Sequence, residues 1–365
     1  MDDHSFDRIE GSNTHQDPAR RKSISSKLMA MLAACTLIAT GCTTAPKSTS
    51  SLGGPLHLQD EGMFYIGGTT RVVSLSLFPG TPPTPGKIVT GQMFVHYRIP
   101  EIAFGKMAAK YPIVLVHGGG LTGVTYETTP DGREGWATYF TRKGYSTYVV
   151  DFPGRGRAGF DVTTVQNNVS VGTLEAVWPL YRFGPRVGEM YPGSQFPAQG
   201  VQGLLTQNVP LTDLLMVGGP YKHAPAALSE LLDRIGPAIV FVHSQSGPMA
   251  DILVELNPTK VKAVVNVEGS QALVPTDAQV RAYRDVPVLE VFGDYLTQDE
   301  KAPTGKPRFE ARTTVADRIN KAGGKASVMH LPGIGIHGNS HMMMQDMNNL
   351  RVADEIASWI ERSIN

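Results

Sequence analysis

The stretch IVFVHSQSG at positions 239–247 decides the fold, because a strand, a sharp turn and a helix start follow one another within it. Its apolar, β-branched first half is typical of a buried strand, and Ser244 then falls at the turn. Such a turn lifts a hydroxyl out of a sheet and places it at the N-terminus of the next helix. A hydroxyl presented in this way is typical of a catalytic nucleophile. Val242 and Ser246 stand where the motif G-x-S-x-G has glycines. Ser246, also at the turn, is the alternative nucleophile, but the strand register and His243 favour Ser244.

Around this stretch, short β-branched runs alternate with helical segments. That alternation predicts a mostly parallel central sheet with helices on both faces. Before it, residues 62–110 indicate antiparallel strands. The expected parallel strands are residues 113–116, 146–150, 238–242, 263–267, 288–292 and 326–331. The expected helices are residues 247–256, a helix opened by a capping box at Thr314-x-x-Asp317 and closed by Gly323-Gly324, and residues 349–363.

The connection from Asp151 to Ser244 is much longer than a plain crossover needs. Its excess, about residues 160–226, is rich in proline, glycine and aromatic residues. Ligands bind at the carboxyl edge of such sheets, so we expect this segment to be a lid inserted over that edge. The alternative is a surface embellishment.

Three glycines, Gly118-Gly119-Gly120, follow the strand at 113–116. Glycine lets the backbone pass close to a ligand and turn its N–H groups toward it. We assign the N–H groups of Gly119 and Gln245 as an oxyanion hole, where each donor is worth about 3 kcal/mol of barrier.

The residues alone leave the base and the acid open. His337 and His341 lie in the loop between the final strand and the final helix, and either could be the base. Glu268 ends one strand, and Asp294 ends the next. The usual position of the acid in such a sheet, after the later strand, favours Asp294.

Composition excludes several classes of protein. Lys plus Arg and Asp plus Glu number 33 each, so the neutral chain carries no basic footprint for nucleic acid. The two cysteines, Cys35 and Cys42, both lie near the N-terminus. We therefore expect neither a disulfide framework nor a cysteine zinc site in the folded body, and no other metal.

The N-terminus has the pattern of an export signal. A basic region precedes a short apolar run at residues 28–40, and the sequence ATGC ending at Cys42 resembles a lipoprotein processing site. We expect residues 1–42 to be the signal, with Cys42 lipidated, residues 43–60 a linker and residues 61–365 the catalytic domain. Ordinary cleavage nearby, giving a periplasmic or secreted protein without an anchor, is the alternative.

Several longer segments carry a resemblance to a known family. They are GQMFVHYRIP, LTGVTYETTPDGREGW, RKGYSTYVVDFPGRGR, VHSQSG, VVNVEG and HGNSHMMMQDMNNL. With them, residues 60–365 resemble the α/β-hydrolases, and more closely a small group of secreted bacterial serine esterases. That group places its acid one strand earlier than usual, as a glutamate.

The resemblance implies the α/β-hydrolase fold with Ser244 as nucleophile, Glu268 as acid, His341 as base and Gly119 in the oxyanion hole. Glutamate has one more methylene than aspartate, so Glu268 can reach the same histidine from the neighbouring strand. The chain departs from the group at Gly119-Gly120, where the group has cysteines. Since backbone N–H groups form the hole, we expect it to survive.

The resulting expectation is hydrolysis of a small-molecule carboxylic ester through an acyl-enzyme, without a cofactor. Lactone opening and C–C bond cleavage on the same triad are alternatives, as is a non-catalytic lipoprotein that binds a ligand under its lid. Haloalkane dehalogenation is disfavoured, because the turn carries a serine instead of a carboxylate.

Overall fold

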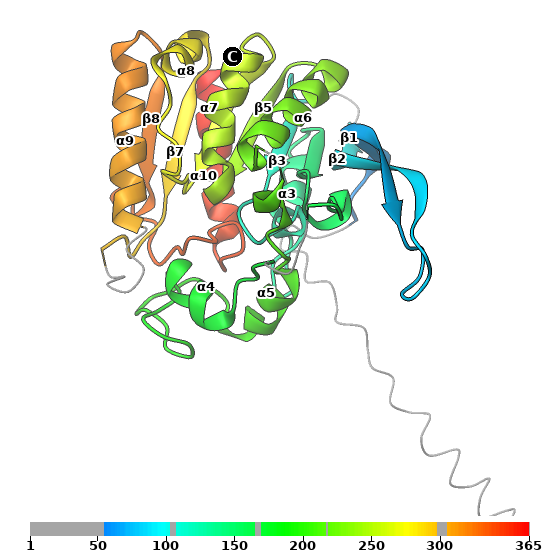
Figure 1. Cartoon of the computed structure of the whole chain (residues 1–365). Helices are drawn as coiled ribbons and strands as arrows, with labels where there is room; N and C mark the ends of the chain where they lie inside the picture. The colour runs from blue at the N-terminus through cyan, green and yellow to red at the C-terminus, as the bar shows by residue number, and fades with distance from the viewer. Residues whose placement is uncertain (1–54, 103–106, 165–168, 217, 298–304, 365) are drawn as a thin grey trace, which may run out of the picture. The chain divides into compact units, whose positions relative to one another are not determined.

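The computed structural model describes residues 55–102, 107–164, 169–216, 218–297 and 305–364, all within the compact unit Thr49–Asn365. An eight-stranded sheet forms its centre, in the order β1-β2-β4-β3-β5-β6-β7-β8 (Figure 1). The β1–β2 and β2–β4 pairs are antiparallel, and the other neighbouring pairs are parallel. No helix in the described part of the chain is long and apolar enough to cross a membrane.

The strands are β1 (Leu58–Leu75), β2 (Thr84–Pro100), β3 (Ile113–Val116), β4 (Thr147–Asp151), β5 (Ala238–His243), β6 (Val261–Val267), β7 (Val288–Phe292) and β8 (Ala326–His330). The α-helices are α2 (Val124–Glu127), α3 (Trp136–Arg142), α4 (Leu174–Leu180), α5 (Val201–Gln207), α6 (Pro220–Ile235), α7 (Gly247–Leu256), α8 (Asp277–Ala282), α9 (Gly305–Lys321) and α10 (Asn349–Ser363). Short 3₁₀ helices are η2 (Gly156–Ala158), η3 (Ala198–Gly200), η4 (Thr212–Leu215), η5 (Ser244–Ser246), η6 (Tyr283–Asp285) and η7 (Leu331–Ile334).

The sheet is buried on both faces because successive side chains of a strand point to opposite sides. Ile113 and Leu115 of β3 pack with α3 and α10, whereas Val114 and Val116 pack with α6 and α7. The same division continues through β5, β6 and β7. Continuous apolar runs are therefore required in these strands, and their carboxyl ends meet at one edge of the sheet.

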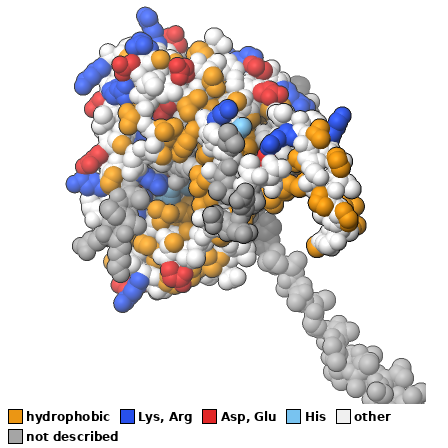
Figure 2. Space-filling model, viewed as in Figure 1, with side chains coloured by type: hydrophobic (Ala, Val, Ile, Leu, Met, Phe, Trp, Pro, Cys, Tyr) orange, Lys and Arg blue, Asp and Glu red, His pale blue; other side chains and the backbone are white. Residues whose placement is uncertain are grey.

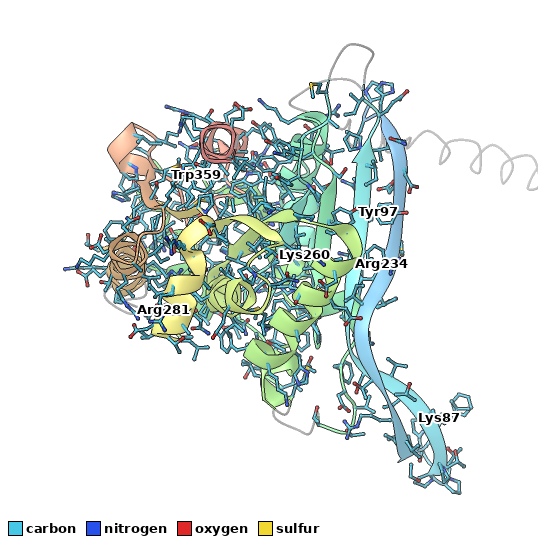
Figure 3. The ribbon with its side chains drawn as sticks, turned by 90° about the horizontal axis from the view of Figure 1, so that it is seen from above. Lys87, Tyr97, Arg234, Lys260, Arg281 and Trp359 are labelled. Carbon is cyan, nitrogen blue, oxygen red and sulfur yellow. The ribbon has the colours of Figure 1, made fainter. Side chains whose placement is uncertain are left out.

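The β1–β2 hairpin extends beyond the part of β2 that pairs with β4. Figure 3 shows Lys87 on its outer part, away from Tyr97 and Arg234 beside the body. Arg234 of α6 stacks on the Phe64 ring, 3.8 Å from its centre, and fixes the inner part of the hairpin. The outer part carries exposed apolar residues, visible in Figure 2, which include Val72, Leu75, Leu77, Phe78 and Val89.

The expected parallel strands and the helices at residues 247–256 and 349–363 are present, with bounds that differ by at most two residues. The antiparallel strands expected within residues 62–110 are β1, which begins earlier at Leu58, and β2, which ends earlier at Pro100. The predicted capping box at Thr314 is wrong, because α9 begins at Gly305 and contains Thr314 in its interior. The Thr314 hydroxyl donates to the carbonyl of Glu310 at 2.8 Å, four residues earlier. A threonine inside a helix satisfies its hydroxyl in this way, so its presence alone does not mark a helix start.

We call residues 160–219, between β4 and α6, the insertion. It ends before Pro220, where α6 begins, because α6 buries Ala224 and Ala227 against the sheet like the other covering helices. The last residues of the expected lid range therefore belong to a core helix. The insertion itself is also anchored, since Trp178, Phe183 and Phe196 join the main core cluster. It is thus an integral part of the domain.

Candidate active site

Ser244 stands at the turn between β5 and α7. Its φ of 52° lies in the left-handed region, which costs a non-glycine residue about 1–3 kcal/mol and is typical of functional sites. The turn is tight: a Cβ on Gly247 would lie 2.8 Å from the Cα of Gly269, in the turn after β6. Ser244 lines a cavity of about 370 Å³, so the strained turn presents its hydroxyl to that space.

Ser246, the alternative nucleophile, is fully buried. Its Oγ accepts a hydrogen bond from the His243 N–H at 2.8 Å and can donate to the carbonyls of His243 (3.0 Å) and Val116 (3.2 Å). This hydroxyl ties the turn to β3 and does not line the cavity beside Ser244.

The glycine loop after β3 lies directly against the serine turn. A Cβ on Gly118 would lie 3.0 Å from the Ser244 Cβ, and one on Gly119 would lie 3.0 Å from Oε1 of Gln245. A side chain at either position would clash with the serine turn. Gly119 and Gln245 line the cavity together with Ser244.

The side chain of Gln245 is held by a buried ion pair that the sequence analysis missed. Asp213 of η4 accepts from Gln245 Nε2 at 3.0 Å, and Arg155 Nη2 donates to Gln245 Oε1 at 3.1 Å. Arg155 and Asp213 also pair with each other at 2.5 Å, both fully buried. The insertion thus fixes the residue that follows Ser244.

Glu268 follows β6 with a φ of 53°, a second non-glycine residue in the left-handed region. Its Oε2 lies 3.3 Å from Nδ1 of His341 and accepts from Arg182 Nη1 at 3.0 Å. Its Oε1 accepts from Arg182 Nη2 at 2.5 Å and from the N–H of Gly293 at 2.8 Å. Burial would raise the pKa of this carboxyl, but Arg182 and His341 outweigh burial and hold the pKa well below its usual range. Glu268 is therefore a carboxylate.

His341 lies in the loop between β8 and α10. Its backbone N–H donates to the carbonyl of Tyr181 at 2.9 Å, and its ring stacks on the Tyr181 ring with 5.6 Å between the ring centres. Burial, then the charge of Arg308, lowers the pKa of His341 to about 4. The imidazole is neutral at pH 7, and the insertion positions it through Tyr181.

Asp294 and His337 do not join this group. Asp294 Oδ2 accepts from the N–H of Gly338 at 3.1 Å, and its own N–H donates to the carbonyl of Asn339 at 2.7 Å. His337 is 69% exposed, and its Nδ1 lies 3.8 Å from Asp294. Asp294 therefore acts as an anchor for the loop that carries His341.

Arg308 of α9 is a further site residue that sequence reasoning missed. Its Nη1 lies 3.1 Å from Ser244 Oγ and 3.1 Å from His341 Nε2. Guanidinium only donates, so Nε2 accepts and the ring proton sits on Nδ1, facing Glu268. This contact brings the serine hydroxyl and the imidazole together at one nitrogen, in the tautomer that a general base needs.

The cavity beside these groups is lined mainly by apolar side chains of the insertion, with a few polar groups. Its lining consists of Gly119, Gly120, Gly172, Val177, Leu180, Tyr181, Asn208, Leu211, Leu214, Tyr221, Ser244, Gln245, Ser270, Ala272 and Arg308. A larger cavity of about 460 Å³ lies between the β1–β2 hairpin and α6, and none of the site residues above line it.

Within the described ranges, no group of three or more His, Cys, Asp and Glu residues is placed to hold a metal ion. Cys42, the expected lipidation site, lies outside the described residues.

Two known proteins resemble the chain over most of its length. A bacterial esterase of solved structure is 39% identical, with a TM-score of 0.76, and the match covers 88% of this chain and 100% of that one. The "Probable secreted lipase phiG" of Fungal sp. (strain ATCC 74256) is 26% identical, covering 76% of this chain and 88% of that protein. No family model matches the chain.

The mostly parallel sheet, the serine turn and these relatives give one identity: the chain belongs to the α/β-hydrolase superfamily. Within that superfamily it is a carboxylic ester hydrolase.

The loop that carries His341 depends on Gly338, whose φ is 82° and whose added Cβ would overlap the carbonyl oxygen of Gly193. We expect Gly338→Ala to displace the loop and to lower ester turnover at least tenfold. Gly335→Ala is the matched control, because its φ of 75° carries the same left-handed strain of about 1–2 kcal/mol but its Cβ would meet open space. Steady-state kinetics and urea unfolding of both variants measure the difference. Equal losses in the two variants would contradict the role assigned to the Gly193 contact.

Proposed function

We propose that the chain hydrolyses carboxylic esters with Ser244 as nucleophile, His341 as general base and Glu268 as the acid that orients His341. The single observation that carries this proposal is the position of Arg308 Nη1, 3.1 Å from both Ser244 Oγ and His341 Nε2. The nucleophile and its base therefore contact the same guanidinium nitrogen, while Glu268 lies 3.3 Å from the other ring nitrogen.

In the proposed reaction, His341 Nε2 takes the proton of Ser244 as Oγ attacks the ester carbonyl. The N–H groups of Gly119 and Gln245 bind the oxyanion. His341 then protonates the leaving alkoxide, which releases the alcohol and leaves an acyl-enzyme. Water, deprotonated by the same imidazole, releases the acid. Glu268 stays ionised throughout and stabilises the imidazolium.

The place of action is also a proposal. The fungal relative is named as secreted, which supports an exported protein. Lipidation of Cys42 is a separate proposal.

The nucleophile can be tested by covalent labelling. A fluorophosphonate should label the purified protein once, and Ser244→Ala should abolish both labelling and ester turnover. Ser246→Ala is the matched control: it should keep labelling while losing stability, because its hydroxyl accepts and donates buried hydrogen bonds worth about 1 kcal/mol each. Mass spectrometry of the labelled peptide assigns the serine. Loss of labelling in Ser246→Ala alone, with the variant folded, would reassign the nucleophile.

The acid can be tested by paired variants. Glu268→Gln should lower kcat by about four orders of magnitude, the loss seen when the acid of a comparable triad is made neutral. Asp294→Asn should lower kcat far less, because Asp294 accepts hydrogen bonds from the backbone N–H groups of Tyr295 and Gly338 and does not contact His341 in the way Glu268 does. Glu268→Gln should also destabilise the fold, since it leaves buried Arg182 without its carboxylate, at a cost of about 3–5 kcal/mol.

Glu268→Asp serves as the control that keeps the charge. Kinetics below the unfolding temperature of each variant separate the two effects. A larger loss of kcat in Asp294→Asn than in Glu268→Gln would move the acid to Asp294.

The pH dependence follows from the pKa of about 4 for His341. The base works only when neutral, so kcat/KM for an uncharged ester should fall as the pH drops through this value. The acidic limb should therefore lie near pH 4, well below the ordinary histidine pKa of about 6.5. Near-ultraviolet circular dichroism checks that the protein remains folded at each pH. An acidic limb near pH 6.5 would show that His341 is not held neutral in this way.

A further inference from the structure

Arg308 differs from the other buried arginines of the described chain. Arg155 pairs with Asp213, Arg182 with Glu268, and Arg312 with both Asp251 and Glu290. Arg308, only 9% exposed, has no carboxylate of its own among the described residues. Its recorded partners are neutral acceptors: the Ser244 hydroxyl, the Glu268 carbonyl and the His341 imidazole.

Among the described residues, the local charge balance is therefore positive. Glu268 already accepts two hydrogen bonds from Arg182 and lies against His341, so its single charge is shared. Arg308 adds a second cation beside that carboxylate. Its Nε is buried and has no acceptor within the described ranges, so the guanidinium retains unused donor capacity.

An unpaired buried cation is costly to a fold unless something compensates it. Arg308 lines the cavity that also holds Ser244, Gly119 and Gln245, so a ligand in the cavity can reach it. Guanidinium is suited to carboxylate, because its fork of donors matches two carboxylate oxygens. The compensating charge is thus best supplied by the substrate.

We propose that the preferred substrates are esters that carry a carboxylate near the scissile bond, and that Arg308 binds this carboxylate. The substrate class includes half-esters of short dicarboxylic acids and acyl esters of hydroxy acids. The inference rests on the proposed function, because it assumes that Ser244 attacks an ester in this cavity. It adds a specificity-determining residue and a chemical class of substrate.

Substrate binding would also help the chemistry. In the structure, Nη1 of Arg308 contacts His341 Nε2, where a proton must arrive when Ser244 is deprotonated. A carboxylate that engages the guanidinium offsets its charge beside the forming imidazolium. Neutral esters would leave that charge unopposed, so discrimination should appear in kcat as well as in KM.

The first experiment compares isosteric esters on the wild-type enzyme at pH 7, followed by pH-stat. Ethyl hydrogen succinate is compared with ethyl succinamate for a carboxylate on the acyl side. Acetoxyacetate is compared with acetoxyacetamide for one on the alcohol side. In at least one pair, kcat/KM for the anion should exceed that for the amide by about 10- to 100-fold, the range that one hydrogen bond to a charged group supports. Equal or lower values for the anion in both pairs overturn the inference.

The second experiment changes the arginine. Arg308→Gln should bring the anion-to-amide ratio of kcat/KM close to one, and Arg308→Lys should retain part of the preference because it keeps the charge. Lys306→Gln is the matched control, since it removes one positive charge from the same helix. The Lys306 side chain is 60% exposed, in contrast to the buried Arg308. The control should leave the ratio unchanged. An equal loss on both members of each pair in Arg308→Gln would make Arg308 a positioning residue for Ser244 and His341 and would overturn the inference.

The proposed function and the proposed carboxylate specificity can fail separately. If the wild-type protein is not labelled at Ser244 and turns over none of the four esters, the proposed function fails. If it is labelled and hydrolyses the amides at least as well as the anions, the esterase function stands and the carboxylate specificity falls.

Discussion

The contact between Arg182 and Glu268 joins the two parts of the molecule on which the site depends. Glu268 belongs to the edge of the sheet, and Arg182 belongs to the insertion. Both side chains are fully buried, so neither charge could remain there without the other. The neighbouring Tyr181 holds the backbone of His341 and stacks on its ring. The segment between β4 and α6 therefore builds the site as well as covering it.

Two strained turns complete the arrangement. Ser244 and Glu268 each follow a parallel strand, and each has a left-handed backbone without being glycine. The turns support one another, because the N–H of Ser270 donates to the carbonyl of Ser244 at 2.9 Å. Strain of about 1–3 kcal/mol at each residue persists only where the surroundings over-determine the conformation. Here the apolar strands β5 and β6, paired through most of their length, supply that rigidity.

Much of the framework could be predicted from the sequence, because its signals are local. Apolar runs bounded by turns gave β3 and β7, and a helical stripe with a stop signal gave α7. Arg155, Arg182 and Arg308 could not be found in this way. Each is distant in sequence from the residue it contacts, and an arginine in a polar segment is normally solvated. The start of α9 was missed for a related reason. The sequence pattern of a capping box also occurs inside helices, where the threonine hydroxyl donates to a carbonyl of the preceding turn.

The charges around His341 explain why its neighbours matter to the reaction. Burial and Arg308 both disfavour the imidazolium, and Glu268 favours it. The first two prevail in the free enzyme, which keeps the base neutral and ready to accept a proton. The same balance opposes the next step, because the proton then arrives beside a guanidinium 3.1 Å away. The transition state is stabilised only if this repulsion between the forming imidazolium and the guanidinium is reduced during the reaction. The oxyanion, in contrast, is stabilised by any nearby positive charge. A negative charge brought by the ligand relieves the repulsion without any change in the protein, because it lies against the guanidinium and offsets its charge.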